Sequence, residues 1–568
     1  MKPNLREHPL TIGLLVDEPK ASKYVLDLCQ WAKNQNDIAI THLIVLENPP
    51  PSNQHTKSIP GLSPLKLICN LTRQKGFFQA LAIVTFWAIC KKEEQSLSSY
   101  ERYKDHLKPC DLTPWVPNSL KINPLISPSG HVYRFSPEDI TRVKSLNFDL
   151  LIRCGGGILR GEILKSSKWG ILSFHHADNR INRGWPAGFW EIYLGQKATG
   201  FTIQILTEQL DGGNVLFRGA IPTKTTYLFN QARLFLTANH YLKQLLRSIA
   251  LKRSLPEILP SPPYDRNYFS HPGLWHISQY YIRSRLKLLC LECRKKFNLK
   301  ERWGVAFVKS DWDKAVLPQG IRLKNPKNHF LADPFVISKK DKDFCFVEDL
   351  DYQSNRGYIS VYEIKDKTAH RLGVALKEPF HLSFPFVFEF NDDLFMCPET
   401  SGKKEIRIYK CIDFPLQWKL EKIIMKGINA ADSMIFEKGG LWWLLTNIDP
   451  LNIGDNTYEM SIFYATAPLS DTWHAHAQNP IIVNPGNGQN GGLLYKDRQY
   501  YRVAQCQGMN TYGESFSINK IKSIDPNVYM EEKIGDVLPI FFKNIFATHH
   551  MHSNGRITVY DFCERARV

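Results

Sequence analysis

A short polar stretch in the first half of the chain gathers most of the residues that could do chemistry. It contains Ser173, His175 and His176, and it continues through the polar side chains Asp178, Asn179, Arg180 and Arg183. The stretch follows an apolar segment that predicts a strand, so it lies where an open parallel sheet presents its carboxyl edge to ligands. A histidine at such an edge is a candidate acid or base, although a lone histidine there is more often structural.

An acidic turn, Leu210–Gly213, comes 36 residues after His175 when counted to Asp211. The intervening residues have room for one helix and one strand. That is enough chain to leave the edge of the sheet and return to it. We therefore expect His175 and Asp211 to meet.

The elements that must position these residues fill the first 250 residues. Apolar segments at residues 12–16, 41–46, 148–152 and 171–175 predict strands, and residues 24–33 have helical spacing. Strands that alternate with helices indicate a parallel, helix-covered sheet. Two further strands on either side of the acidic turn, at 201–205 and 215–221, and a long helix at 227–249 complete the predicted α/β domain over residues 1–250.

The order of these motifs resembles that of the folate-dependent formyltransferases, which include the glycinamide ribonucleotide, methionyl-tRNA and sugar N-formyltransferases. The matching residues are Phe174-His175, Gly200–Thr202 and Leu210–Gly213. The segment Cys154–Arg160 stands where that family has its folate-binding loop. The resemblance extends over residues 140–225 and implies a Rossmann-like fold.

The resemblance also implies roles for the polar residues. The formyl donor would be 10-formyltetrahydrofolate, held by backbone groups of Gly155, Gly156, Gly157, Ile158 and Leu159. His175 would stabilise the oxyanion and move a proton, while Asp211 would orient His175 and help to remove the amine proton. The acceptor would be bound by His176, Asp178, Asn179, Arg180 and Arg183.

Ser173 departs from the family pattern, which has an asparagine at this position. That asparagine donates a hydrogen bond to the oxyanion, and losing such a donor typically costs about 2.7–4 kcal/mol. Ser173 could act as a shorter donor, or His176 or Asn179 could replace it. A slow or purely binding domain is the alternative.

From residue 303 onward the sequence changes to short aromatic strands separated by Gly, Asp and Asn turns. A weak repeat begins at Leu331–Val336, returns at Leu382–Val387, and returns again at Ala430–Ile435. Asp333 and Pro385 are 52 residues apart, and Pro385 and Asp432 are 47 residues apart. Such a period predicts an all-β, five-bladed β-propeller-like domain over residues 303–568.

This half resembles the propeller-like domain at the N-terminus of the plant glucosamine inositol phosphorylceramide transferases. The resemblance rests on the segments Ala332–Phe335, His381–Pro385, Pro398–Ser401 and Trp442–Leu445. It implies a carbohydrate context. Four carboxylates fall near equivalent positions of the repeat and could line a central cavity: Asp333, Glu348, Glu399 and Asp432. A hydrolase would need two of them at a suitable separation, whereas a sugar-binding site would need them only as hydrogen-bond acceptors.

Composition sets the outer limits. The net charge of +17 favours anionic partners, and residues 251–302, with a basic helix, predict a linker that could touch an anionic membrane. The apolar run Phe77–Cys90 is shorter than a membrane span and predicts a buried helix. Twelve cysteines without regular spacing, and an N-terminus without a signal-peptide pattern, indicate a cytoplasmic protein. Cys290 and Cys293 have no second pair, so no metal site is predicted.

The sequence therefore predicts transfer of a formyl group from 10-formyltetrahydrofolate to an amine, on an amino sugar or nucleotide sugar of a surface-glycan precursor. The alternative is a glycoside hydrolase or glycan-binding protein acting through the second half. Methionyl-tRNA formylation is a weaker rival, because the second half does not look like a tRNA-binding barrel, and no nucleic-acid partner is expected.

Overall fold

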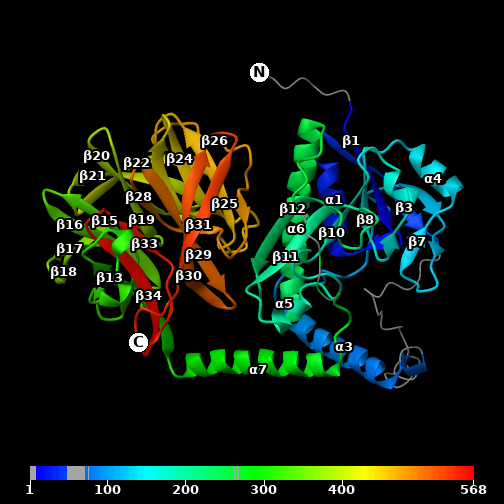
Figure 1. The fold of residues 1–568 in the computed structure, drawn as a ribbon, viewed down its shortest axis with the longest axis horizontal. Coiled ribbons are helices and arrows are strands. Elements are labelled where there is room, and N and C mark those ends of the chain that lie inside the picture. The colour runs from blue at the N-terminus through cyan, green and yellow to red at the C-terminus, as the bar shows by residue number, and fades with distance from the viewer. Residues whose placement is uncertain are drawn as a thin grey trace. The chain divides into compact units, whose positions relative to one another are not determined.

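The chain forms two compact units, Met1–Leu286 and Lys287–Val568 (Figure 1). The structure, a computed structural model, describes residues 8–47, 71–73, 76–260, 264, 266 and 268–567. The first unit is α/β and the second is built almost entirely of strands. The change in sequence texture near residue 303 corresponds to this division.

The first unit is organised around a seven-stranded sheet with the order β12-β11-β10-β8-β1-β3-β5. Its strands are β1 (Leu10–Val16), β3 (Ile38–Leu46), β5 (Asn118–Ile122), β8 (Leu150–Cys154), β10 (Ile171–His175), β11 (Ala198–Ile205) and β12 (Asn214–Pro222). The five strands from β5 to β10 run parallel, and β11 is antiparallel to both of its neighbours. The chain builds β1, β3 and β5 toward one side and then crosses to β8, so the strand order reverses between β1 and β8. Ligands of open α/β sheets bind at such a switch point.

Helices cover this sheet. They are α1 (Lys23–Lys33), α3 (Phe77–Leu97), α4 (Pro137–Lys144), α5 (Phe189–Tyr193) and α6 (Tyr227–Lys252). Short strands add two small sheets: β2 (Lys20–Ala21) with β4 (Cys110–Asp111), and β6 (Leu125–Ile126) with β7 (Val132–Arg134) and β9 (Ile158–Leu159). The long helix α6 buries Leu234, Tyr241 and Leu242 completely. It therefore closes the unit, as its sequence predicts.

The apolar run at Phe77 forms the first part of α3, which is buried on one side only. Ala80, Ala82 and Phe86 are buried, whereas Phe77 and Phe78 are exposed. Across the described part of the chain, every helix is too short or too polar to span a membrane.

The boundary between the units falls inside helix α7 (Leu274–Lys296), within the segment predicted as a linker. Ile277 and Tyr280 on its first turns are buried in the first unit. The Tyr280 hydroxyl donates to Glu93 and accepts the backbone N–H of Tyr227 at 2.8 Å. The first part of the predicted linker thus belongs to the first unit, because these buried contacts anchor it there.

The second unit consists of five antiparallel sheets. The first contains β13 (Leu299–Val308), β14 (Ile321–Arg322), β32 (Ile545–Ala547), β33 (Met551–Ser553) and β34 (Thr558–Arg567). The second contains β15 (His329–Lys339), β16 (Lys342–Asp351), β17 (Arg356–Lys365) and β18 (Thr368–Leu376), and the third contains β19 (Ser383–Phe390), β20 (Asp393–Glu399), β21 (Glu405–Asp413) and β22 (Gln417–Lys426). The fourth contains β23 (Ala430–Lys438), β24 (Leu441–Ile448), β25 (Glu459–Ala465), β26 (His474–Ala475) and β27 (Ile482–Val483), and the fifth contains β28 (Gln489–Lys496), β29 (Gln499–Gly508), β30 (Thr511–Ile524) and β31 (Tyr529–Val537).

These sheets form a closed, propeller-like ring. The first strands of successive sheets contact one another, β15 with β19, β19 with β23, and β23 with β28, while β33 contacts both β28 and β15. In the first sheet, β13 from the start of the unit pairs with β34 from its end. This pairing joins the start of the unit to its end within one sheet, and it thereby closes the ring.

The sequence repeat marks a bulge in each innermost strand. The pairing register shifts after Ala332, Ser383, Ala431 and Asn490. At three of these bulges the next residue has a left-handed backbone: φ is 49° at Asp333, 46° at Phe384 and 48° at Asp432. Such bulges re-aim side chains, and here they set the direction of two carboxylates.

Candidate active site

His175 and Asp211 come together at the edge of the first sheet. His175 ends β10, and Asp211 lies in the turn between β11 and β12 with a left-handed φ of 49°. The His175 Nδ1 atom is 3.5 Å from Asp211 Oδ1. His175 is buried, whereas 28% of the Asp211 side chain is exposed. The predicted meeting of the two residues is present in the structure.

The other ring nitrogen of His175 is fixed by the backbone. Nε2 lies 2.9 Å from the carbonyl oxygen of Asn182. Because a carbonyl only accepts, Nε2 carries the hydrogen and donates it. Nδ1 is then the atom that exchanges a proton, and its 3.5 Å separation from Asp211 is longer than an ordinary hydrogen bond. The pair is therefore open to a reacting group on the Nδ1 side.

Two buried polar residues, Asn182 and Glu191, support the His175 ring. The Asn182 amide donates to Glu191 at 2.9 Å. Burial, opposed by the Asn182 hydrogen bond, raises the pKa of Glu191. Glu191 thus holds the side chain of Asn182, and the backbone carbonyl of Asn182 in turn holds the His175 ring.

Asn179 and Arg183 tie the loop after β10 to the turn that carries Asp211. Asn179 is fully buried, and its amide donates to the Asp211 carbonyl at 3.4 Å. The guanidinium of Arg183 donates to the carbonyls of Asn179 and Leu210 at 2.9 and 3.2 Å. Both residues were predicted to bind the acceptor, but these contacts make them positioning residues for Asp211.

Asp178 and Arg180 form an ion pair nearby, with Arg180 Nη2 2.6 Å from Asp178 Oδ2. Arg218, which the sequence did not single out, lies 3.5 Å from the same carboxylate. Burial opposes ionisation of Asp178, but the hydrogen bonds from Arg180 and the charges of both arginines lower its pKa. The exposed Arg180 and the carboxylate remain candidates for acceptor binding.

His176 has a different environment from its neighbour. Its ring packs on Phe174 and Phe235, with centroids 5.0 and 4.1 Å away, and on the edge of Tyr24. Burial and the charge of His175 lower the pKa of His176 to about 3. The ring is therefore a neutral packing group, and its contacts do not support the predicted role in acceptor binding.

Ser173 is half-buried on the same strand as His175, two residues earlier. Residues two apart on a strand face the same side. The Ser173 hydroxyl donates to the carbonyl of Phe174 at 3.3 Å, which is long for a hydroxyl. The Ser173 hydroxyl is therefore only weakly bonded within the protein.

The glycine loop after β8 is clamped by two residues that sequence reasoning missed. The backbone N–H of Gly156 donates to Asp17 Oδ2 at 2.8 Å, and Arg153 donates to the Gly156 carbonyl and to Asp17. Asp17 follows β1 and Arg153 lies on β8, so the clamp stands at the switch point of the sheet. The position of Asp17 directly after the first predicted strand could have identified it in the sequence as a residue at this edge of the sheet.

The loop also requires glycine for steric reasons. A Cβ at Gly155 would lie 2.5 Å from Asp17 Oδ1, and one at Gly157, where φ is 77°, would lie 2.3 Å from the Tyr133 ring. Gly157 is exposed and Ile158 is half-buried, whereas Leu159 is buried in the core with Tyr133. The loop thus offers backbone rather than side chains to a flat ligand, and this fits the edge of a pterin.

The four carboxylates predicted in the second unit gather around the inner strands. Asp333 and Asp432 stand on the bulges of β15 and β23, while Glu348 and Glu399 pair across from the bulges, opposite Ala332 and Ser383. Burial comes first in raising the pKa of Glu348 to about 7 and that of Asp432 well above its usual range, and the charges of Asp333 and Glu399 raise both further. The charges of Asp333 and Glu399 therefore affect the ionisation of both Glu348 and Asp432.

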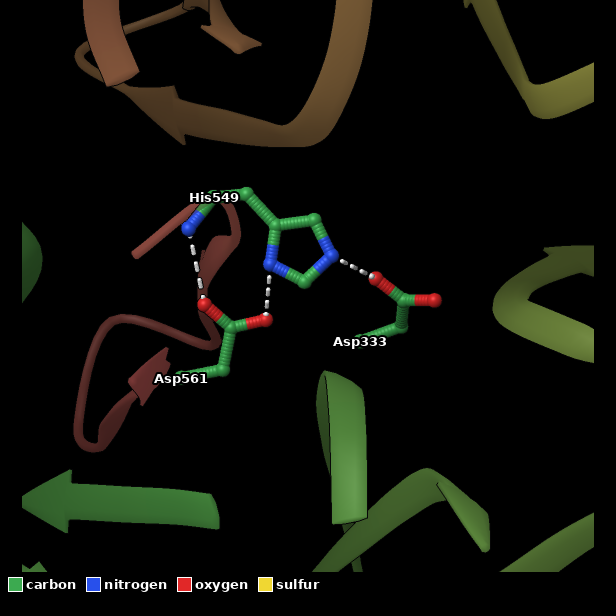
Figure 2. Close-up of side chains that lie close together, drawn as sticks. All are labelled: Asp333, His549 and Asp561. Atoms are coloured by element: carbon green, nitrogen blue, oxygen red, sulfur yellow. Dashed lines mark hydrogen bonds and ion pairs between the residues drawn. The ribbon is translucent and has the colours of Figure 1, made fainter. Parts of the chain in front are cut away.

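Sequence reasoning missed the histidines of this centre. His549 lies between two carboxylates, with Nδ1 2.6 Å from Asp561 Oδ2 and Nε2 3.3 Å from Asp333 Oδ1 (Figure 2). His381 Nε2 lies 3.3 Å from Glu348 Oε1. The double histidine at 549–550 was visible in the sequence, but only as a possible last copy of the repeat.

Known proteins resemble each unit separately. The family described as "Glucosamine inositolphosphorylceramide transferase 1, N-terminal" matches residues 270–548. The protein of that name from Oryza sativa subsp. japonica is 34% identical over 268 residues, which cover 46% of this chain and 34% of the rice protein. The chain thus spans about a third of the length of these relatives.

The first unit matches formyltransferases over shorter stretches. Methionyl-tRNA formyltransferase from Bacillus subtilis (strain 168) is 32% identical over 90 residues, which cover 16% of this chain and 28% of that enzyme. Glycinamide ribonucleotide transformylase 1 from Symbiobacterium toebii, a solved structure, covers 45% of this chain and 96% of its own, with a TM-score of 0.27 and 16% identity. The first unit is therefore formyltransferase-like in sequence.

Proposed function

We propose that the first unit transfers a formyl group from 10-formyltetrahydrofolate to the amine of an amino sugar. The observation that carries this proposal is the proton-exchanging Nδ1 of His175, which faces Asp211 one strand away from the clamped glycine loop. The formyltransferase-like sequence of the unit supports the same reaction.

The reaction needs a group that moves a proton. The attacking amine loses one proton, and the nitrogen of the donor that loses the formyl group gains one. Nδ1 of His175 can take the first and return the second, since Nε2 stays bonded to the Asn182 carbonyl throughout. Asp211 stabilises the imidazolium between these two events.

Backbone groups of the loop from Gly155 to Leu159 would hold the donor, which supplies the formyl carbon when bound. Within the protein, the N–H of Gly156 is bonded to Asp17 and that of Ile158 to the His131 carbonyl. The exposed Gly157 is therefore the residue most open to a ligand. Asp17 and Arg153 keep the loop in one shape and reduce the entropy that binding must overcome.

The choice of an amino sugar as acceptor rests on the second unit. The names of its relatives, glucosamine inositolphosphorylceramide transferases, contain an amino sugar, and this supports a glycan setting for the whole chain. Asp178 and Arg180 lie on the loop that follows His175 and are the candidate acceptor contacts. We assign each sheet of the second unit as one blade of a five-bladed propeller. Glycan binding there is a second function, whereas hydrolysis has no separate observation in its favour.

We also propose that the protein works in the cytoplasm, beside an anionic membrane surface. Helix α7 exposes Trp275, Ile282 and Leu286 together with the cationic Arg283 and Lys287. An exposed apolar and basic helix is suited to such a surface. Co-sedimentation with phosphatidylglycerol vesicles, and none with phosphatidylcholine vesicles, would support this location.

The formyl-transfer proposal is tested with the full chain, 10-formyltetrahydrofolate and a panel of free and nucleotide-linked amino sugars. Mass spectrometry should show the gain of one formyl group on a sugar with a free amine, and none on its N-acetylated counterpart. No product on any amine, together with no binding of a folate analogue at millimolar concentration, would overturn the proposal.

A further inference from the structure

The centre of the second unit carries more buried negative groups than positive ones. Five carboxyl groups surround it: Asp333, Glu348, Glu399, Asp432 and Asp561. Two histidines stand among them: His549 lies between Asp333 and Asp561, and His381 faces Glu348 with Nε2 while its Nδ1 accepts the backbone N–H of Gly357. Burying an uncompensated charge is costly, so the imbalance calls for a reason.

The first part of the centre is a chain of Asp561, His549 and Asp333, in which two carboxylates share one histidine. Asp561 is fully buried, and its Oδ1 accepts the backbone N–H groups of His549 and His550 at 2.9 and 3.1 Å. Its other oxygen holds Nδ1 of His549, whose Nε2 faces Asp333 (Figure 2). Asp333 also accepts the backbone N–H of Phe384 at 3.2 Å. The three side chains therefore hold one another mainly through ion pairs.

The second part is not balanced. Glu399 accepts hydrogen bonds from the hydroxyls of Ser383 and Ser401 at 3.0 and 2.6 Å. Asp432 accepts one from the Gln489 amide at 2.7 Å. These hydrogen-bond partners of Glu399 and Asp432 are neutral. Burial first, and then the neighbouring carboxylates, raise the pKa of both Glu399 and Asp432.

A separate observation shows that the centre has unused hydrogen-bonding capacity. His550 is fully buried beside the backbone of Pro334, and neither of its ring nitrogens makes a hydrogen bond of good geometry in the described part of the chain. Its Nδ1 is 3.6 Å from Asp333 Oδ1, and its ring packs against Phe335 and Phe384. A polar ring held in this way against a carboxylate centre is ready to bond a ligand.

Tyr512 offers a partly exposed aromatic surface next to these carboxyl groups. Tyr512 is 43% exposed, although its hydroxyl is 2.8 Å from the Gln489 amide that holds Asp432. The Tyr512 ring lies beside Trp303 and His549, with centroids 6.5 and 5.4 Å away. An apolar ring next to hydrogen-bonding groups is the usual surface for one face of a sugar.

A metal ion is a poorer match for the same residues. Asp333, His549 and Asp561 offer ligand atoms within 4.8 Å of one another. However, both ring nitrogens of His549 already face these carboxylates directly. An ion would have to break these contacts, so the missing charge is better supplied at Glu399 and Asp432, where the partners are neutral.

We propose that the centre of the second unit binds the protonated amine of an amino sugar, between Glu399 and Asp432 and against Tyr512. An ammonium group brings one positive charge and three donors, which suits carboxylates that have only neutral partners. The choice of an amino sugar rests on the proposed function, but the binding itself does not require formyl transfer. The unit would then collect the same class of acceptor that the first unit modifies.

The test is isothermal titration calorimetry of the full chain with glucosamine, N-acetylglucosamine and Ca²⁺. Glucosamine should bind at least tenfold more tightly than N-acetylglucosamine, which lacks the charge. Asp432→Asn and Glu399→Gln should each weaken glucosamine binding at least tenfold. The matched control is Asp471→Asn, because Asp471 belongs to the same unit but is 93% exposed, and its affinity should equal that of the wild type.

Thermal unfolding of each variant separates a binding defect from a folding defect, and Glu399→Gln keeps the shape of a half-buried side chain if Asp432→Asn unfolds. Equal affinity for the two sugars, or wild-type affinity in both folded variants, would overturn the proposal. Tight Ca²⁺ binding without glucosamine binding would replace it with a divalent-cation site. If the wild-type chain binds glucosamine but transfers no formyl group, only the proposed function is refuted. If it transfers a formyl group but does not bind glucosamine as described, only this inference is refuted.

Discussion

Each of the two units holds a histidine beside a carboxylate, and the two histidines differ in their other partners. His175 is bonded on one side to a neutral carbonyl, and on the other side it faces the partly exposed Asp211 at 3.5 Å. His549 lies between two buried carboxylates, at 2.6 and 3.3 Å. Solvent reaches the carboxylate beside His175, whereas both carboxylates beside His549 are buried.

The difference comes from what surrounds each ring. Burial would make His549 neutral, but the charges and hydrogen bonds of Asp561 and Asp333 outweigh burial and raise its pKa well above the usual range. His175 lies beside Asp211, whose side chain is 28% exposed, and its other ring nitrogen is bonded to a neutral carbonyl. A histidine becomes a fixed cation when two buried carboxylates hold it, and it remains exchangeable when one partner is neutral.

The largest expected effect is the loss of formyl transfer in His175→Asn. The rate should fall by about 10²–10⁴-fold, the usual contribution of a general acid or base. Folate-analogue binding should persist, because the glycine loop is held by Asp17 and Arg153. His176→Phe is the matched control and should keep the rate within a few-fold, since that ring only packs. Equal rates in wild type and His175→Asn would remove the distinction between the two histidines.

Asp561→Asn should act on stability instead of rate. It removes the buried carboxylate that holds His549 and both backbone N–H groups, and breaking a buried ion pair typically costs about 3–5 kcal/mol. Calorimetry should show a lower transition for the second unit with formyl transfer by the first unit retained. A variant with unchanged melting would show that the chain of Asp561, His549 and Asp333 contributes little to folding.

Ser173→Asn should raise the rate of formyl transfer, by about tenfold or more if the restored amide acts as an oxyanion donor. Asn179 is hydrogen-bonded to Asp211 and Arg218, and the His176 ring packs on aromatic side chains, so we expect Ser173 to be the better position for the donor. Steady-state kinetics of Ser173→Asn and Ser173→Ala distinguish the cases. A lower rate in Ser173→Asn would show that another donor already fills this place.

The smallest effect is a loss of stability of the second unit between pH 6.5 and 9. Burial opposes protonation of His381, but Glu348 raises its pKa to about 9. The folded state thus holds this proton more tightly than the unfolded chain, whose histidine pKa is about 6.5. The stabilisation is complete below that value and is lost as the pH rises toward 9.

Glu348, whose pKa burial raises to about 7, acts in the same direction at the lower end of this range. The melting temperature should therefore fall by a few degrees from pH 6.5 to 9, and it should fall less in His381→Gln. The control is His474→Gln, at an exposed position on β26. A flat profile in the wild type would contradict the raised pKa of His381.

The sequence predicted the parts of the molecule that depend on local order. His175 ends a strand, and Asp211 lies in a turn that one helix and one strand bring back to it, so their meeting followed from the topology. The positions of Asp333 and Asp432 followed from the repeat, because each copy of the repeat is a bulge in an inner strand.

Only the tertiary structure determined which charged groups that are distant in the sequence become partners. Asp17 and Arg153 are 136 residues apart, and they meet because β1 and β8 are neighbours in the sheet. Asp561 and His549 reach Asp333 because the last strands of the second unit close the ring against β15. Hydrophobic and turn patterns fix the elements along the chain, but electrostatic partners depend on which strands become adjacent, and that is set only when the sheet and the ring are complete.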